Sequence, residues 1–336
     1  MKSLVCESPG VLRVEERSRP TRQGDEVLIR IRRVGICGTD MHIFQGTQPY
    51  LSYPRVMGHE LAGEVVEFPE GSPLAAGDIV YVMPYMSCGD CVACNQGKTN
   101  CCTNIQVLGV HCDGGLAEFI AVREEFVFKT EGVTVDQAAM IEFLAIGAHA
   151  VRRSGLAAGK NVLVVGAGPI GLASALFSRL HGGQVTLLDS RDDRLEFARS
   201  QLGFERVVRV GDGDTGRLAD ITAGQFFDIV FDATGNRVAM ERGFGLLAHG
   251  GTYVLVSIVR GDITFNDAEF HKRETSLLGS RNATVEDFAA VVEAMKAGHI
   301  PTHLLNTHRA KLTDLPDLMP AWLDPQAGVI KALVEC

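Results

Sequence analysis

The stretch "NVLVVGAGPIGLASA", residues 161–175, constrains the fold of this chain more than any other. An apolar, β-branched run leads into Gly166, Gly168 and Gly171, which have the GxGxxG spacing and precede a helix-like segment. A lone match to that spacing is weak, because glycines also serve ordinary tight turns. Here a strand precedes the glycines, a helix follows, and the next apolar strand, "QVTLLDS", ends on Asp189. This context predicts a dinucleotide-binding βαβ unit.

Each part of the motif has a physical role. The first glycine permits the turn, the second lets the backbone approach the pyrophosphate, and the third allows helix and strand to pack closely. The helix N-terminus offers unpaired N–H groups to the phosphates. Asp189 stands where a carboxylate accepts hydrogen bonds from the adenosine ribose and repels a 2′-phosphate, which favours NAD over NADP. Arg191 and Arg194 follow closely and keep NADP use open.

The rest of the chain indicates two kinds of domain. Strands and helices alternate from residue 161 to 280, which predicts an α/β, doubly wound parallel sheet. The first 130 residues instead read as short strands with turn signals, such as "EVLIRIRRVGI" and "HELAGEVVEF". A helical segment is expected from a cap at Thr134 to a stop at Gly155, and a late amphipathic helix ends at Gly298. At 336 residues, two domains are the better expectation.

Composition excludes several classes of protein. Hydrophobic residues make up 46% and charged residues 22%, which is typical of a folded globular chain. The net charge of −9, from 41 acidic and 32 basic residues, gives no electrostatic reason to expect nucleic acid or an anionic membrane as partner. The N-terminal stretch lacks the apolar run of a signal peptide, and no internal run spans a bilayer. We therefore expect a cytoplasmic protein whose nine cysteines are metal ligands or buried thiols rather than disulfides.

The stretch "SCGDCVACNQGKTNCC" carries a candidate metal site. It supplies Cys88, Cys91 and Cys94 at three-residue steps and Cys102 eight residues later. Four thiolates on a short loop match a closed tetrahedral zinc site, which stabilises structure and leaves no open position for chemistry. An iron–sulfur cluster or unbound surface thiols are the alternatives, and the absence of a following Cys-Pro favours zinc. Cys101 is the spare cysteine.

A second ligand set is spread along the chain. Cys37 ends an apolar strand in "RRVGICGTDMHIFQG", His59 and Glu60 are adjacent in "MGHELAGE", and Glu142 lies in an apolar helical segment. A buried carboxylate is costly unless something pairs with it, and a metal is a suitable partner. A thiolate, an imidazole and a carboxylate with an open fourth position are typical of catalytic zinc. Each residue alone is also compatible with an ordinary core or surface role.

The chain resembles the zinc-dependent medium-chain dehydrogenases over essentially its full length. The stretches that carry the resemblance are "GICGTDMH", "GHELAGE", "CGDCVACNQGKTNCC", "GVHCDGGLAEF", "IEFLAIGAHA" and "GAGPIGL". The Glu142 segment is similar to the polyol and threonine dehydrogenase branch. "GTQPYLSYPRVMGHE" and "EFHKRETSLLGSRNATVEDF" look most like bacterial L-galactonate 5-dehydrogenases and their sugar-acid relatives.

The resemblance implies a GroES-like, β-rich catalytic domain in two parts, residues 1–143 and 281–336, and a Rossmann NAD-binding domain at 144–280. It also implies a small-molecule polyol or sugar-acid substrate and a homodimer or homotetramer. Two zinc ions per chain are implied, one catalytic and one structural.

The resemblance assigns roles residue by residue. Cys37, His59 and Glu60 fall on catalytic zinc positions, and Glu142 falls on a position that either ligates zinc or holds the water beside it. Thr39 matches the hydroxyl that bonds the substrate alcohol, and His42 matches the outer end of a proton relay that runs through the nicotinamide ribose. The four loop cysteines match the structural zinc ligands. Cofactor contacts are expected from Gly166, Gly168, Pro169, Ile170, Gly171, Asp189, Arg194, Thr234, Gly235, Ser257 and Ile258.

Substrate recognition is expected at Arg281 and Asn282. Arg281 matches a substrate-side arginine of polyol dehydrogenases, while a structural ion pair is the alternative role. Three positions depart from the family pattern: Pro69 replaces a glycine of "GHExxGxxxxxG", Phe143 replaces a proline, and Asn282 replaces a tyrosine. The expected reaction is reversible oxidation of a secondary alcohol to a ketone with NAD. The alternative is a zinc-stabilised dinucleotide-binding scaffold or redox sensor without turnover.

Overall fold

The computed structural model describes all residues from 1 to 336, and the chain divides into two compact units. We call Met1–Phe143 with Thr284–Cys336 the two-segment unit, and Leu144–Ala283 the central unit. The second crossing between them falls three residues beyond the predicted position. Ser280 donates a backbone hydrogen bond to Leu255 of the central sheet at 2.9 Å, and residues 281–283 follow it within the same unit.

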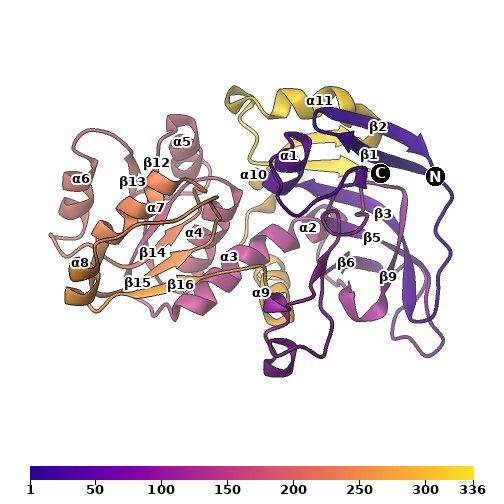
Figure 1. Ribbon diagram of the computed structural model, residues 1–336, viewed down its shortest axis with the longest axis horizontal. Helices are drawn as coiled ribbons and strands as arrows, with labels where there is room; N and C mark the ends of the chain where they lie inside the picture. Colours follow the sequence, from indigo (N-terminus) through magenta and orange to yellow (C-terminus); the bar gives the residue numbers. More distant parts are fainter. The chain divides into compact units, whose positions relative to one another are not determined.

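The two-segment unit is built mainly of antiparallel strands (Figure 1). Its strands are β1 Lys2–Ser8, β2 Val11–Glu16, β3 Glu26–Ile36, β4 Arg55–Val56, β5 Glu60–Glu67, β6 Ile79–Val82, β7 Tyr85–Met86, β8 Gln106–Val107, β9 Phe119–Arg123, β10 Val127–Lys129, β17 Asn306–Lys311 and β18 Lys331–Glu335. Its helices are α1 Gly38–Phe44, α2 Val135–Ala138, α9 Val285–Lys296, α10 Thr302–Leu305 and α11 Leu315–Trp322, with short 3₁₀ turns η1 Cys94–Gln96, η2 Thr99–Cys101, η3 Glu124–Phe126, η5 Leu312–Asp314 and η6 Pro325–Ala327.

The main sheet of this unit joins residues from both ends of the chain. Its strand order is β10-β6-β5-β3-β18-β17, with β9 also paired to β3. The long strand β3 alternates buried and exposed positions along part of its length, and its buried side chains reach 0–1% exposure from Val27 to Val34. Such burial stabilises by roughly 25 cal/mol per Å² of apolar surface removed from water. Strand β18 lies directly beside β3, with Ala332 opposite Ile36.

The helical segment predicted from Thr134 to Gly155 is interrupted in the structure. Thr134 does cap α2, since its hydroxyl accepts from the Gln137 N–H at 3.2 Å, but α2 ends at Ala138. A new helix, α3 Ile141–Ser154, then begins. The break places Glu142 in the first turn of α3, where the helix dipole favours a negative charge.

The central unit contains one parallel sheet of order β13-β12-β11-β14-β15-β16. Its strands are β11 Asn161–Val165, β12 Gln184–Asp189, β13 Val207–Arg209, β14 Phe227–Asp232, β15 Leu247–Leu255 and β16 Ser276–Gly279. Its helices are α4 Pro169–Leu180, α5 Asp192–Ser200, α6 Asp214–Ile221, α7 Arg237–Gly243 and α8 Asp267–Lys272, with η4 Phe244–Leu246; most of α3 also belongs here. The α/β class predicted for this part is confirmed.

The glycine motif lies between β11 and α4. Gly166 has φ +97°, a left-handed conformation that glycine adopts without penalty. Gly171 is in close contact with the turn, because a Cβ there would lie 1.7 Å from the carbonyl oxygen of Gly166. The motif therefore packs the helix directly against the loop that begins it. No helix anywhere in the chain is both long enough and apolar enough to cross a lipid bilayer.

We predict opposite effects of the same substitution at two glycines of the central unit. Gly171→Ala should destabilise by about 1–3 kcal/mol or more, because the added methyl group overlaps the backbone of Gly166. Gly216→Ala should be neutral or stabilise by about 0.5–1 kcal/mol, because this residue lies in α6 with open space around its Cα. Thermal unfolding of the nucleotide-free protein checks both. Equal stability of the two variants would contradict the packing role of Gly171.

Candidate active site

Two neighbouring strands bring the dispersed ligand set together. Cys37 directly follows β3 and begins α1, while His59 and Glu60 stand at the start of β5. Because β3 and β5 pair with Gly35 opposite Glu60, the three candidate ligands converge. Their ligand atoms all lie within 4.8 Å of one another. Gly35 is needed here, since a Cβ at this position would lie 2.0 Å from Glu60 Oε2.

A buried carboxylate fixes the loops that carry these ligands. Asp40 is fully buried; its Oδ2 accepts from the Cys37 N–H at 2.9 Å and its Oδ1 accepts from the Gly58 N–H at 3.1 Å. One side chain thus ties the residue after β3 to the residue before His59. Sequence reasoning missed Asp40, although its position three residues after Cys37 is that of the acidic partner in a capping box.

Glu60 has a cationic partner from the far end of the chain. Lys331 Nζ lies 2.6 Å from Glu60 Oε1 and 2.8 Å from Oε2, and it also donates to the Ile36 carbonyl at 3.1 Å. Burial opposes the charge of Lys331, but the negative charges of Glu60 and Cys37 outweigh it and raise the lysine pKa. Phe143, which replaces the family's proline, packs its ring 4.3 Å from this ammonium. Sequence reasoning missed Lys331, although it is the only charged residue in the apolar run "GVIKALV".

Glu142 lies in the same buried region and has a different partner. It is 3% exposed, and its Oε1 accepts a hydrogen bond from the Tyr85 hydroxyl. Its Oε2 is buried without a hydrogen-bond partner. Burial raises the pKa of this carboxyl to about 7, and the nearby His59 acts in the opposite direction.

The unpaired atoms of this region fit a cation. His59 Nδ1, like Glu142 Oε2, is buried with no hydrogen-bond partner. Burial disfavours the charged imidazole, yet the negative charges of Cys37, Asp40 and Glu142 raise the His59 pKa well above its usual value. A largely buried site with sulfur, imidazole and carboxylate donors matches the preferences of zinc. The residues present therefore fit the catalytic zinc expected from the sequence.

The two predicted relay residues lie on the short helix α1. Thr39 is half-buried, with its Oγ1 3.9 Å from Cys37 Sγ. His42 is exposed, and its Nδ1 lies 2.9 Å from Thr47 Oγ1. Thr39 therefore lies beside a candidate zinc ligand, whereas His42, one helical turn further on, is in contact with solvent.

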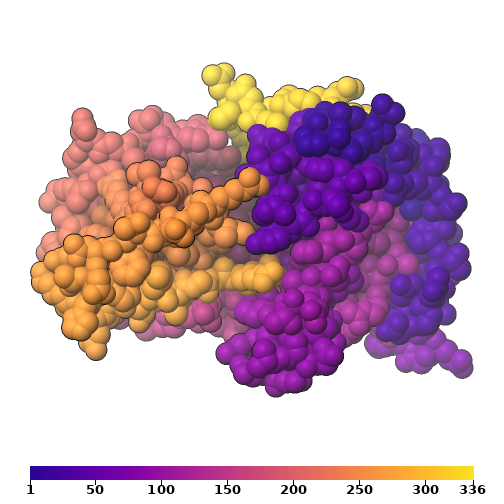
Figure 2. All heavy atoms as spheres, in the orientation of Figure 1, coloured from indigo at the N-terminus to yellow at the C-terminus, as the bar shows by residue number.

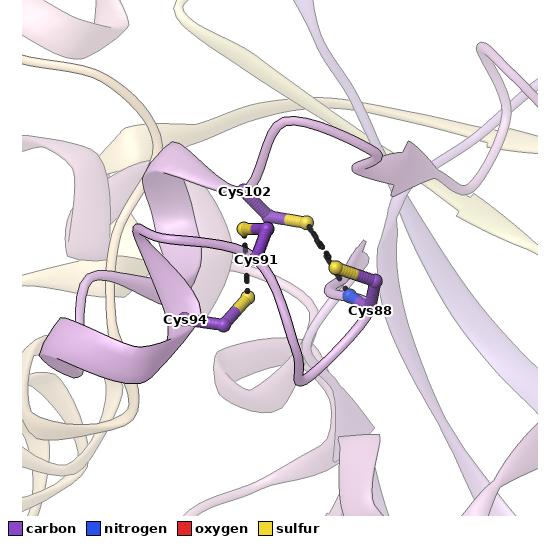
Figure 3. Close-up of side chains that lie close together, drawn as sticks. All are labelled: Cys88, Cys91, Cys94 and Cys102. Atoms are coloured by element: carbon purple, nitrogen blue, oxygen red, sulfur yellow. Dashed lines mark hydrogen bonds between the residues drawn. The ribbon is translucent and has the colours of Figure 1, made fainter.

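The four loop cysteines form a second, separate cluster. The sulfur atoms of Cys88, Cys91, Cys94 and Cys102 all lie within 4.8 Å of one another, and two pairs of them are 3.4 and 3.5 Å apart (Figure 3). Tetrahedral zinc with Zn–S bonds of about 2.3 Å would separate its sulfurs by about 3.8 Å. Hydrogen bonds from the Cys94 and Thr103 backbone lower the Cys91 pKa to about 5, which favours the thiolate. The thiols are free, and most of the loop lies at the surface of its unit, coloured purple in Figure 2.

The central unit carries the predicted dinucleotide site. A cleft of ≈ 490 Å³ is lined by Gly166, Gly168, Asp189, Arg194 and Thr234 among others. The other predicted contacts, Pro169, Ile170, Gly171, Gly235, Ser257 and Ile258, do not line this cleft.

The carboxylate at the end of β12 is held by the glycine loop. Asp189 Oδ2 accepts from the Ala167 N–H at 2.5 Å, and Oδ1 accepts from the Arg191 N–H at 2.8 Å. The guanidinium of Arg191 instead pairs with Asp193. The remaining lone pairs of Asp189 are available to a ribose, and its charge opposes a further phosphate.

Sequence reasoning missed two further residues of the central unit: Arg242, which lines the cleft, and Asp232, which is buried and holds the cleft residue Thr234. Arg242 lines the cleft and pairs with the buried Asp214, with nitrogen–oxygen distances of 2.5 and 2.8 Å. Asp232, at the end of β14, accepts from the backbone N–H and the hydroxyl of Thr234 at 2.9 and 2.7 Å. The available signal for Asp232 was an aspartate at the end of an apolar strand, the same pattern that identified Asp189.

The predicted substrate residues follow β16 at the edge of the central unit. Arg281 is exposed, whereas Asn282 is half-buried and adopts φ +53°. The amide nitrogen of Asn282 is buried without a hydrogen-bond partner. Asparagine tolerates the left-handed conformation better than most residues. The roles of both residues stay predictions.

Comparisons with known proteins agree with this geometry. Residues 23–132 match the model of the alcohol dehydrogenase GroES-like domain, and residues 169–297 match that of zinc-binding dehydrogenases. The L-galactonate-5-dehydrogenase of Escherichia coli K12 is 43% identical over 318 residues, which cover 94% of each chain. The sorbitol dehydrogenase of Halalkalibacterium halodurans is 30% identical, again over 94% of each chain.

A solved structure extends the likeness to three dimensions. An alcohol dehydrogenase of Escherichia coli CFT073, crystallised with NADH, superposes with a TM-score of 0.93 at 31% identity, covering 100% of this chain and 99% of that one. Together with the sequence matches, this shows that the chain belongs to the zinc-dependent alcohol and polyol dehydrogenases, with a GroES-like domain and a nucleotide-binding domain.

Proposed function

We propose that the protein reversibly oxidises a secondary hydroxyl of a polyol or sugar acid, of the L-galactonate type, to a ketone with NAD. The observation that carries the proposal is the convergence of the half-buried Cys37 with the buried His59 and Glu60, with unpaired atoms on His59 and Glu142. The 43% identity to an L-galactonate-5-dehydrogenase over 94% of the chain supports the substrate class. A screen of sugar acids and polyols with NAD, followed by NADH absorbance, tests it.

Residues of the two-segment unit bind the two zinc ions and transfer the substrate proton. Cys37 and His59 would hold zinc together with a glutamate, and the four loop cysteines would hold the structural ion. When bound, zinc supplies a Lewis acid that polarises the substrate hydroxyl, and the nicotinamide supplies the hydride acceptor. The Thr39 hydroxyl would accept the substrate proton as it gives up its own, and the exposed His42 would pass the released proton to solvent.

The central unit orients the dinucleotide. The unpaired N–H groups at the start of α4 receive the pyrophosphate, next to the turn at Gly166. Asp189 then binds the adenosine ribose and selects NAD. Arg281 recognises an anionic substrate group, since its planar guanidinium matches a carboxylate on a protein whose net charge is −9.

The two zinc sites should be separable by mutation. Cys37→Ser should lose one zinc ion and turnover while the fold and the second zinc survive, because the two ligand sets share no residue. Cys91→Ser is the matched variant and should lose the other zinc, with a lower melting temperature. Metal analysis per chain and circular dichroism measure both. A Cys37→Ser protein that retains two zinc ions and normal turnover would show that Cys37 is not a ligand.

Cofactor choice should depend on the carboxylate at the end of β12. Asp189→Ala should narrow the NAD preference in kcat/KM by about tenfold or more, because it removes charged hydrogen bonds worth about 1.5–3 kcal/mol and the repulsion of a 2′-phosphate. Asp192→Ala is the control, since Asp192 is an exposed residue of α5 that does not line the cleft. Better kcat/KM with NADP in the unmodified enzyme would refute the assignment.

The arginine after β16 should discriminate between substrates. Arg281→Ala should cost about 2–5 kcal/mol in kcat/KM for an aldonate, because a paired carboxylate loses its partner. A neutral polyol should lose far less. Steady-state kinetics on both substrates, with melting temperatures, check this. Equal losses with lowered thermal stability would indicate a structural ion pair and make a neutral polyol the better substrate proposal.

A further inference from the structure

The two buried glutamates beside Cys37 and His59 are held by chemically different partners. Both oxygens of Glu60 are bound by the ammonium of Lys331, at 2.6 and 2.8 Å. Glu142 is bound through one oxygen only, by the neutral phenol of Tyr85. The other oxygen of Glu142 has no partner. Glu142 is therefore the carboxylate that keeps an oxygen available.

Tyr85 is itself fixed in position by its surroundings. It lies on β7, opposite Val107 of β8, and is 4% exposed. Its ring meets the fully buried Phe288 of α9 edge-on, with centroids 6.2 Å apart and planes at 74°. Packed aromatic side chains have few rotamers, so the phenol can hold a carboxylate in one orientation. The phenol is the donor in this hydrogen bond, since an ionised carboxylate can only accept.

We propose that Tyr85 is a positioning residue, which binds Glu142 Oε1 and thereby presents Oε2 to the Cys37–His59 centre. This inference rests on the proposed function, which places zinc at that centre. Without the hydroxyl, the two oxygens of Glu142 become equivalent and the carboxylate can rotate about its last torsion. A second buried oxygen would then also lack a partner, which is costly. Tyr85 thus acts on the metal through Glu142.

The chain provides a matched control for the loss of a buried tyrosine hydroxyl. Tyr81 lies on β6, is 5% exposed and stacks on the same Phe288 ring, with centroids 5.7 Å apart. It makes no hydrogen bond to Glu142, whose hydroxyl partner is Tyr85. Tyr85→Phe and Tyr81→Phe therefore remove the same atom from similar packing, but only the first change touches Glu142.

The experiment uses the purified, zinc-loaded protein. Zinc release to a chelator, the visible spectrum after cobalt replaces the Cys37-site zinc, and melting temperature are measured for both variants. Loss of a hydrogen bond to a metal ligand typically lowers metal affinity about 10- to 100-fold, so Tyr85→Phe should release one of the two zinc ions faster by up to about that factor. It should also shift the cobalt spectrum. Tyr81→Phe should behave like the unmodified protein. The zinc of the cysteine loop should be unchanged in both.

A double-mutant cycle tests whether the effect passes through Glu142. In a Glu142→Ala background, the further change Tyr85→Phe should leave zinc release unchanged. A full additional effect there, or identical behaviour of Tyr85→Phe and Tyr81→Phe in a protein that holds two zinc ions and turns over, would overturn the inference. If the unmodified protein neither binds metal at Cys37 nor catalyses the reaction, the proposed function is wrong. The inference about Tyr85, which rests on it, is then wrong as well.

Discussion

The burial of charge in the two-segment unit is the constraint on which the rest of its structure depends. Asp40, His59, Glu60, Glu142 and Lys331 are each at most 4% exposed, within a largely apolar β-sheet core. An isolated charge there would cost several kcal/mol, so every one of these groups needs a partner. Strand β18 must therefore lie beside β3 to deliver the ammonium, and α1 must turn back to place Asp40 against two backbone N–H groups. The atoms that remain unpaired after these contacts, on His59 and Glu142, are available to a metal ion.

Structural features that depend on residues close together in the sequence could be predicted from it. The alternation of strands and helices predicted the parallel sheet, and the strand–glycine–helix context predicted the turn at Gly166, because both depend on residues a few positions apart. The three-residue steps of the loop cysteines likewise place their sulfurs together. Several short helices, such as α6 and α8, were not predicted, since they are only eight and six residues long and rich in charged residues.

Features that depend on distant partners could not be read from the chain. Lys331 lies between the apolar Ile330 and Ala332, but nothing near it in sequence identifies its partner, and only the sheet pairing places it on Glu60. Tyr85 reads as an ordinary strand residue until Glu142 lies against its hydroxyl. The break between α2 and α3 is of the same kind: the residues are good helix formers, but packing puts Glu142 at a helix start. Sequence thus identified the candidate ligands, and the structure added the groups that hold them.

The ion pair between Glu60 and Lys331, separated by 271 residues, also determines when the centre can be completed during protein synthesis. A ribosome finishes the central unit before it makes residues 284–336, and domains generally fold as units while the chain emerges. The central unit is thus the first part able to fold completely. Until β18 is made, the part of β3 that pairs with it is an open sheet edge. Glu60 also lacks the Lys331 ammonium that neutralises its charge when it is buried. The nascent chain consequently has its nucleotide fold before it can have its metal site.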